Sequence, residues 1–259
     1  MSIQSTLEGG VLRLTLNRPE KSNAFDDEVI ADLTQAFLGA ATDAAVRVVV
    51  LAAAGKYFSA GGDLGWMQRM AGFSDEENLA DAQALAALMR AIDRCPKPVL
   101  ARVQGSAFAG AVGLLACCDI VISVPAAQFA ITEVRLGLIP AVISPYVVRA
   151  IGVRQARRWS LTAERFSAVA AKEMGLVHEL AEPEQLDAVV QAQIDSLLLA
   201  SPAALAEAKS LLAYVDQPLT EAVINETAAR IARQRASKDG REGVTAFLEK
   251  RTPSWRSQP

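Results

Sequence analysis

One acidic residue and two loops of small residues are the parts of this chain that could carry out chemistry. Glu133 is the only acid between Asp119 and Glu164, and it lies in an otherwise apolar segment. Ionising a carboxyl group there is unfavourable, so an isolated acid in such a segment is a candidate proton-transfer group. The alternative role for Glu133 is structural, as an internal cap or as a salt-bridge partner of Arg135.

The two loops, at residues 58–64 and 104–110, are built largely from Gly, Ala and Ser, and each runs into a helical pattern. Small residues let the backbone approach a ligand closely, and the N–H groups at the start of a helix favour an anion. The two loops can therefore present one N–H group each to a single oxygen, which would form an oxyanion hole. Glycine-rich turns before helices also occur without any function, so the spacing alone leaves a purely structural role open.

Composition narrows the classes of partner. The chain has 259 residues, of which 51% are hydrophobic and 21% charged, as in an ordinary soluble protein with a sizeable core. Its net charge of −3 gives no general attraction to polyanions, so we expect no nucleic-acid partner and no anionic membrane partner. Residues 1–6 show no basic segment followed by an apolar run, and the apolar stretch 107–118 is too short to cross a bilayer. We therefore expect a cytoplasmic protein.

The cysteines and the single histidine predict no further chemistry. Cys95, Cys117 and Cys118 lack the spacing of a zinc site or a disulfide framework, so we expect core residues in a reducing compartment and no bound metal. His178 stands at the end of a short strand pattern and is expected to be structural, which argues against a Ser-His-Asp hydrolase. No phosphate-binding or dinucleotide-binding motif is present.

Strands and helices alternate around the two loops, and the last part of the chain is helical, which predicts an α/β core followed by a helical lobe. A capping box at Ser74 and Glu77 marks one helix start. The pattern predicts strands at 3–7, 11–16, 47–51, 99–103, 119–124 and 176–180, and helices from 26, through 66–70, from 74, over 111–118, 140–149 and 154–161, and from 183 onward.

Several short motifs occur together along the chain. They are Leu16 to Pro19, Phe58 to Asp63, Gln104-Gly105 with Gly110, Cys118 to Ile120, Glu133 with Gly137 to Pro140, and Phe247 to Pro253. In combination these motifs resemble the enoyl-CoA hydratase/isomerase (crotonase) family. The resemblance implies a spiral core of ββα turns with the active site over residues 1–195 and a helical trimerisation lobe over 196–259. It also implies acyl-CoA chemistry through an enolate, and assembly as a homotrimer or as a hexamer of two trimers.

The same resemblance implies particular site residues. By position, the oxyanion N–H groups belong to Gly62 and Gly110, and Glu133 is the catalytic acid/base. No separate cofactor is implied, because coenzyme A is part of the substrate. The residues implied for the CoA moiety are Lys21, Asn23, Ala24, Ala60, Gly61, Gly62, Asp63 and Leu64, with Phe247 and Lys250 contacting the adenine end from a neighbouring subunit.

One position departs from the family pattern. Many hydratases of this family carry two catalytic glutamates, whereas this sequence has Gly113 at the first of the two positions. The glycine predicts room in the pocket where a glutamate side chain would have stood. Residues 133–152 are nevertheless similar to bacterial methylglutaconyl-CoA hydratases of leucine breakdown, as are the run 64–67 and the doublet Cys117-Cys118.

The leading expectation is hydration of the α,β-double bond of methylglutaconyl-CoA or a close branched relative. Two roles are open for the distal carboxylate: a cation such as Arg135 or Arg69 holds it, or it helps to orient the water itself. The alternative role of either arginine is that of a solvated surface residue. The alternatives are a Δ3,Δ2-enoyl-CoA isomerase, because one carboxylate suffices to move a proton between two carbons, and a general short-chain enoyl-CoA hydratase. A CoA-binding or RNA-binding protein without turnover is disfavoured by the acidic pI near 5.4 and by the presence of Glu133.

Overall fold

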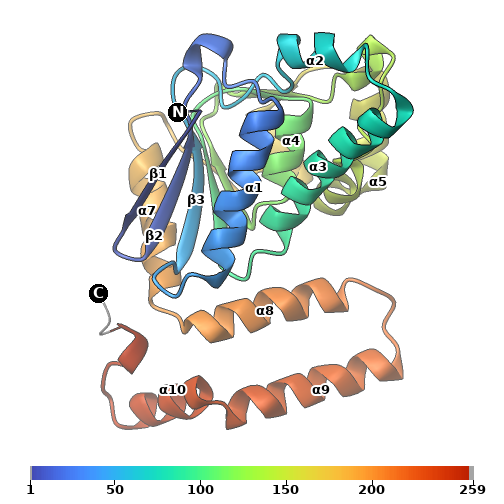
Figure 1. Cartoon of the computed structure of the whole chain (residues 1–259). Helices are drawn as coiled ribbons and strands as arrows, with labels where there is room; N and C mark the ends of the chain where they lie inside the picture. The colour runs from blue at the N-terminus through green and yellow to red at the C-terminus, as the bar shows by residue number, and fades with distance from the viewer. Residues whose placement is uncertain (1, 257–259) are drawn as a thin grey trace.

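The computed structural model describes residues 2–256 of the chain. Figure 1 shows an upper body, in which helices pack against a sheet, and a separate layer of helices below it. The N-terminal strands lie at one side of the body, and the last part of the chain returns toward that side.

A six-stranded sheet forms the centre of the body, in the order β1-β2-β3-β4-β6-β9. β1 (Ile3–Glu8) pairs with β2 in an antiparallel hairpin, and all the other pairs in this sheet are parallel. β3 (Val48–Ala53) is apolar and buried along its whole length, as expected for a strand covered on both faces. The other strands of this sheet are β2 (Val11–Leu16), β4 (Val99–Val103), β6 (Ile120–Ser123) and β9 (Glu179–Leu180).

A second, three-stranded sheet positions the two segments that matter for chemistry. β5 (Ala107–Phe108) pairs in parallel with β7 (Gln128–Ala130), and β7 pairs with β8 (Phe166–Ser167). β5 is followed at once by helix α4 (Gly110–Ala116), and β7 is followed closely by the 3-10 helix η2 (Glu133–Leu136). The pairing of β5 with β7 therefore brings the start of α4 and the start of η2 to the same end of this small sheet.

Several of the body helices begin at a capping side chain. The Asp26 carboxylate accepts a hydrogen bond from the N–H group of Val29 at the start of α1, and Ser74 and Glu77 form a complete capping box at the start of α3. These reciprocal bonds satisfy N–H groups that the first turn of a helix leaves unpaired. The body helices besides α4 are α1 (Asp27–Thr42), α2 (Leu64–Met70), α3 (Asp75–Asp93), α5 (Ser144–Thr162), α6 (Ala168–Met174) and α7 (Leu186–Leu198), and the other 3-10 helices are η1 (Pro19–Lys21) and η3 (Ser254–Arg256).

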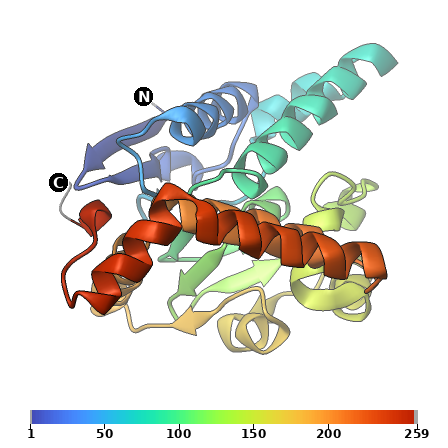
Figure 2. The ribbon, with the colours of Figure 1, turned by 90° about the horizontal axis from the view of Figure 1, so that it is seen from below.

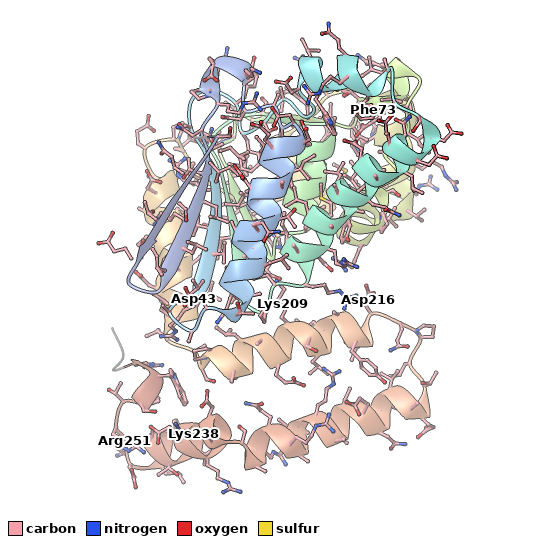
Figure 3. The ribbon with its side chains drawn as sticks, viewed as in Figure 1. Asp43, Phe73, Lys209, Asp216, Lys238 and Arg251 are labelled. Carbon is pink, nitrogen blue, oxygen red and sulfur yellow. The ribbon has the colours of Figure 1, made fainter. Side chains whose placement is uncertain are left out.

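The lower layer consists of α8 (Pro202–Val215), α9 (Glu221–Ala236) and α10 (Lys238–Leu248). In the view from below, α9 lies across the underside of the body (Figure 2). Lys209 lies on the side of α8 that faces the body (Figure 3), and its ammonium group pairs with the Asp119 carboxylate at 2.7 Å.

A second tether joins the sheet to the C-terminal part of the chain. The guanidinium group of Arg47, just before β3, donates hydrogen bonds to the carbonyl oxygens of Leu198, Ala200 and Trp255. Arg47 therefore holds the end of α7, the link to α8 and the C-terminal 3-10 helix at one point.

The α/β class predicted from the sequence is confirmed, as are the N-terminal hairpin and the capping box. The predicted break at Gly152 is also confirmed, because the backbone there has a φ of 75° and a ψ of 152°, so that α5 consists of two helical segments that meet at a kink; the first segment begins at Ser144 rather than at residue 140. His178 has the predicted structural role, because its Nδ1 accepts a hydrogen bond from the N–H group of Val121 at 3.0 Å. The division at residues 195 and 196 stays a prediction.

Within residues 2–256 no single helix is long and apolar enough to cross a bilayer. α7 and α8 meet the length and hydropathy criteria only when taken together, and they are bent by 102° relative to each other.

Candidate active site

The two glycine loops are joined side by side through their backbones. Gly62 forms a parallel bridge with Phe25, in which the Phe25 N–H donates to the Gly61 carbonyl and the Asp63 N–H donates to the Phe25 carbonyl, both at 2.9 Å. On the other side of the loop, the Phe108 N–H donates to the Ser59 carbonyl at 3.0 Å. The first loop is thus held between the start of α1 and the segment that leads into α4.

These bonds leave two backbone donors without partners. The N–H groups of Gly62 and Gly110 have no hydrogen-bond acceptor within residues 2–256. For Gly62, the bridge to Phe25 uses the groups on either side of it. Gly110 opens α4, and the first N–H groups of a helix have no acceptor within the helix. Both glycines therefore keep a free donor, as an oxyanion hole requires.

Ala109 adopts an unusual backbone conformation at the N-cap of α4, with a φ of 51° and a ψ of −125°. Positive φ values favour glycine, and a non-glycine residue there carries strain of about 1–3 kcal/mol. The Ala109 N–H donates to the Ala130 carbonyl at 2.8 Å, which fixes this turn against β7. The strain lies directly before one of the two free donors.

Two aromatic rings pack against the two glycines. A Cβ atom on Gly110 would lie 2.7 Å from Cζ of Phe25, and a Cβ atom on Gly62 would lie 3.3 Å from Cζ3 of Trp66. The ring centroids of Phe25 and Trp66 are 6.5 Å apart. Glycine at both positions lets the backbone lie directly on these rings, so the positions of the two donors depend on the aromatic pair.

Glu133 stands at the start of η2, three residues after the end of β7. Its Oε2 atom is buried and has no hydrogen-bond partner within residues 2–256. Burial raises the pKa of the Glu133 carboxyl group, and backbone N–H groups of residues 132 and 133 oppose this shift only in part. The alternative salt bridge to Arg135 does not contribute to this pKa. The oxygen is thus desolvated and uncommitted, as suits a proton-transfer group.

The expectation of empty space at Gly113 is wrong. A Cβ atom at this position would lie 2.6 Å from Cβ of Ile143 and 3.4 Å from Cε of Met89. Ile143 itself is only 2% exposed. The residue before α5 therefore occupies the volume next to α4, and apolar atoms stand where a second carboxylate would have been.

The residues implied for CoA divide into two groups, the first of which is turned inward. The buried Asn23 amide donates to the carbonyl oxygens of Ala54 and Tyr57, at 2.7 and 2.8 Å. The Asp63 carboxylate accepts from the N–H groups at the start of α2 and pairs with Lys21 at 3.1 Å. These two side chains position the loop and are not free to contact a ligand, a role that the sequence analysis did not assign.

The second group of CoA residues lies at the surface. The Lys21 side chain is 51% exposed and Leu64 is 78% exposed, and Ala60 is also exposed at the rim of the loop. Gly61 is buried, with its backbone against the carbonyl of Phe108.

Phe247 and Lys250 are not brought to the site within one chain. Phe247 lies on α10 and is 81% exposed, and Lys250 lies two residues after the end of α10. α10 and α2 lie at opposite ends of the molecule (Figure 1). Any contact of these two residues with a CoA molecule at the Gly62 loop has to come from another copy of the chain.

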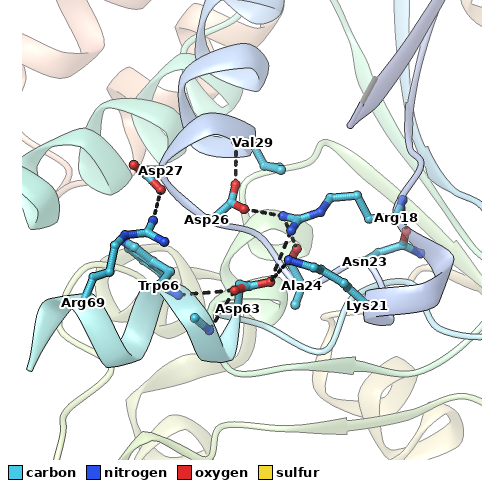
Figure 4. Close-up of polar contacts among 11 residues, drawn as sticks. Arg18, Lys21, Asn23, Ala24, Asp26, Asp27, Val29, Asp63, Trp66 and Arg69 are labelled. Carbon is cyan, nitrogen blue, oxygen red and sulfur yellow. Dashed lines mark hydrogen bonds and ion pairs between the residues drawn. The ribbon is translucent and has the colours of Figure 1, made fainter.

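Sequence reasoning missed one central side chain, that of Arg18. Its guanidinium group pairs with Asp26 at 2.6 Å and with Asp63 at 3.2 Å, and it also donates to the carbonyl oxygen of Ala24 (Figure 4). Arg18 thereby links the capping carboxylates of α1 and α2. The sequence shows only a conventional-looking arginine before a proline, and no local spacing reveals its two distant partners.

Burial acts to raise the pKa of Asp63, but hydrogen bonds from Lys21 and from the N–H groups of Trp66 and Gly65 outweigh it and hold the pKa below its usual value. The Asp63 carboxylate therefore stays negatively charged beneath the surface of the loop.

Among residues 2–256, no group of three or more His, Cys, Asp or Glu side chains could hold a metal ion.

Comparisons with known proteins agree on one family. The family model described as enoyl-CoA hydratase/isomerase matches residues 6–258. The crystal structure of an enoyl-CoA hydratase from Shewanella pealeana has a TM-score of 0.96 and 46% identity, covering 98% of this chain and 96% of that chain. The 2,3-dehydroadipyl-CoA hydratase of Escherichia coli is 32% identical over 252 residues and 96% of both chains. A trans-2-decenoyl-[acyl-carrier-protein] isomerase of Streptococcus mutans is 31% identical over 254 residues, covering 96% of this chain and 95% of the relative.

The close packing of α4 against Ile143 can be tested by adding a single methyl group. Gly113→Ala should lower the free energy of unfolding by about 1–3 kcal/mol, because the methyl group collides with Ile143. Gly39→Ala is the matched control, since Gly39 also lies in a helix but a Cβ atom there meets nothing within 4 Å. That change should be neutral or stabilising by up to about 1 kcal/mol. Urea denaturation followed by circular dichroism measures both, and equal effects would contradict the packing described.

Proposed function

The chain belongs to the enoyl-CoA hydratase/isomerase family, and from this premise we propose that it adds water across the α,β-double bond of an enoyl-CoA thioester. The observation that carries the proposal is the buried, unpartnered Oε2 of Glu133. The free N–H groups of Gly62 and Gly110 support it, because a thioester enolate needs donors for its oxygen.

The proposed hydration uses one carboxylate for both proton transfers. Glu133 takes a proton from water while the water oxygen bonds to C3 of the substrate. The electron pair of the double bond moves toward the thioester, and the N–H groups of Gly62 and Gly110 donate to the resulting enolate oxygen. Each such donor is typically worth about 3 kcal/mol in the transition state. Protonated Glu133 then delivers its proton to C2, so one water is added and the carboxylate is restored.

A Δ3,Δ2-enoyl-CoA isomerase is the second candidate, and the apolar surroundings of Gly113 favour it specifically. With Ile143 beside that position, no second acid is available there to orient a water. In the isomerase reaction Glu133 would take a proton from C2 of a 3-enoyl thioester and return it to C4. The enolate is the same, and the two reactions differ in whether conjugated enoyl absorbance is lost or gained.

We propose methylglutaconyl-CoA, or a closely related branched acyl-CoA, as the substrate. The E. coli relative carries in its name a dicarboxylic acyl group, dehydroadipyl, which supports a distal carboxylate on the substrate. Of the two candidate cations, Arg69 is already paired with Asp27 at 2.5 Å. Arg135 has no acidic partner within ion-pair distance in the described part of the chain and lies on η2, two residues after Glu133, so it is the better candidate.

Glu133→Gln should lower kcat by about two orders of magnitude, because the amide cannot exchange protons as a general acid/base. In the wild-type enzyme the carboxylate is needed as a base, and burial raises its pKa above the ordinary glutamate value of 4.5. As the pH decreases, kcat/KM should therefore begin to fall at a pH above that ordinary value. The pH-rate profile of hydration of a short enoyl-CoA thioester measures this.

The same variant has an expected effect on stability, with the sign fixed by linkage. A raised folded-state pKa means that the ionised carboxyl destabilises the fold, and this penalty appears as pH rises through that pKa. Glu133→Gln should therefore unfold at a higher temperature than wild type at pH 7, and this advantage should shrink in acid. Near-normal turnover of a folded Glu133→Gln enzyme would refute the assignment.

Substrate preference gives a separate test. Methylglutaconyl-CoA should be hydrated with a kcat/KM about tenfold or more above that of crotonyl-CoA, because a charged hydrogen bond to the distal carboxylate contributes about 1.5–3 kcal/mol. Arg135→Gln should reduce this ratio, whereas Arg69→Gln should leave it unchanged. Equal efficiency on the two thioesters would leave a general short-chain hydratase or an isomerase.

We further propose a homotrimer, or a hexamer of two trimers, built through α8 to α10. The lower layer exposes large apolar side chains, including Leu212 at 68%, Leu219 at 77% and Leu248 at 73%. A cavity of about 710 Å³ also separates α8 from the body. A stable monomer rarely exposes so many large apolar residues in one region.

Light scattering at micromolar concentration should therefore give three or six times the chain mass of 27.5 kDa. Deleting the residues after Gly240, which include Phe247 and Lys250, should raise KM for the CoA thioester. A monomeric mass for the full chain would contradict the assembly.

A further inference from the structure

The aromatic pair beneath the two free donors is itself held by a hydrogen bond from a helix outside the glycine loops. The indole Nε1–H of Trp66, on α2, donates to Oδ1 of Asp81 on α3 at 2.9 Å. Trp66 is only 5% exposed, so its N–H needs a partner within the protein. Asp81 makes no ion pair within residues 2–256, so this carboxylate has no competing charged partner there.

The contacts form a continuous chain from α3 to the proposed oxyanion hole. Asp81 fixes the indole, the indole lies against Gly62, and Phe25 packs between Trp66 and Gly110. α2 has only seven residues, and besides Trp66 it is held by its cap at Asp63, by the packing of Met70 against the core and by the exposed ion pair of Arg69. A rotation of the indole would therefore displace the Gly62 backbone, against which the ring packs.

We propose that Asp81 is a positioning residue of the oxyanion hole, acting through the Trp66 indole on the N–H group of Gly62. The inference rests on the proposed function of Gly62 and Gly110. Its physical basis is that a donor displaced by a fraction of an ångström stabilises a developing oxyanion poorly, even when substrate still binds. Asp81 does not itself touch the reacting atoms in this account.

The primary experiment compares two substitutions of the same residue. Asp81→Leu removes the acceptor and should lower kcat about tenfold, with KM for the thioester changed less than about twofold, because the CoA contacts lie elsewhere. Asp81→Asn keeps an acceptor oxygen and should retain kcat within about threefold of wild type. The assay follows the change in enoyl absorbance with methylglutaconyl-CoA and crotonyl-CoA, using whichever turns over faster.

Ser74→Ala is the matched control for a merely structural effect. It weakens the capping box of the same helix, α3, without touching Trp66. Its melting temperature should fall while kcat stays within about twofold of wild type. If Ser74→Ala lowers kcat as much as Asp81→Leu does, the effect of Asp81 comes from the stability of α3 and the inference is wrong.

A donor variant and an NMR measurement test the same hydrogen bond from the side of Trp66, and the NMR measurement does not depend on the folding of Asp81→Leu. Trp66→Phe removes the donor, and the Trp66→Phe/Asp81→Leu enzyme should have the kcat of Trp66→Phe alone, since both changes break one bond. The chain has three tryptophans, and only the indole N–H signal of Trp66 should shift in the NMR spectrum of Asp81→Asn. Additive losses, or an unchanged Trp66 signal, would overturn the proposal.

A pair of Gly110 variants separates failure of this inference from failure of the proposed function. Gly110→Pro and Gly110→Ala both place a Cβ atom against Phe25, but only proline removes the N–H group. Proline should be slower than alanine by about 100-fold or more. If the two are equally active, the oxyanion proposal fails together with this inference. If they differ as expected while Asp81→Leu retains full kcat, only the role of Asp81 is refuted.

Discussion

The arrangement of the site loops depends on the ion pairs that the guanidinium group of Arg18 forms. It lies between the carboxylates of Asp26 and Asp63, each of which caps a helix, and Lys21 adds a second cation beside Asp63. Two carboxylates facing each other without a cation would repel and push the starts of α1 and α2 apart. Because the charges are balanced within the protein, the first glycine loop is ordered before any ligand arrives. Donors fixed in advance do not have to reorganise when negative charge develops, which is the main source of electrostatic catalysis.

The surroundings of Glu133 and those of Gly113 both restrict which reactions the site can carry out. The Glu133 carboxyl group is desolvated and its Oε2 atom has no hydrogen-bond partner in the described part of the chain, and the volume next to α4 is filled by Ile143 and Met89. A single acid of this kind can serve either the addition of water or the movement of a double bond, because both pass through the same enolate. The outcome then depends on where the acyl chain and a water molecule lie. The names of the relatives, which include both a hydratase and an isomerase, agree with that flexibility of the family.

The sequence predicted most of what is local and little of what joins distant segments. The hairpin around Gly9 and the capping box at Ser74 were predictable because their signals lie within a few residues. The two loops and Glu133 could be singled out by composition, and the family resemblance assigned their roles. The packing of Ile143 on Gly113 could not be predicted, because these residues lie on different helical segments and the fit depends on how closely those segments approach. The inward direction of the Asn23 and Asp63 side chains escaped detection for the same reason.

The tethers of the lower layer have a consequence for biosynthesis. Arg47 and Asp119 lie in the body, whereas their partners include Lys209 and the carbonyl oxygens of Leu198, Ala200 and Trp255, which the ribosome adds much later. Chains begin to fold from the N-terminus while synthesis continues. The glycine loops and Glu133 therefore emerge first, and during that interval the guanidinium group of Arg47 lacks these acceptors, while the carboxylate of Asp119 has only its hydrogen bond from the Val99 N–H group. The lower layer can therefore dock only after the body has been synthesised, when the segment from Leu198 to Lys209 has left the ribosome.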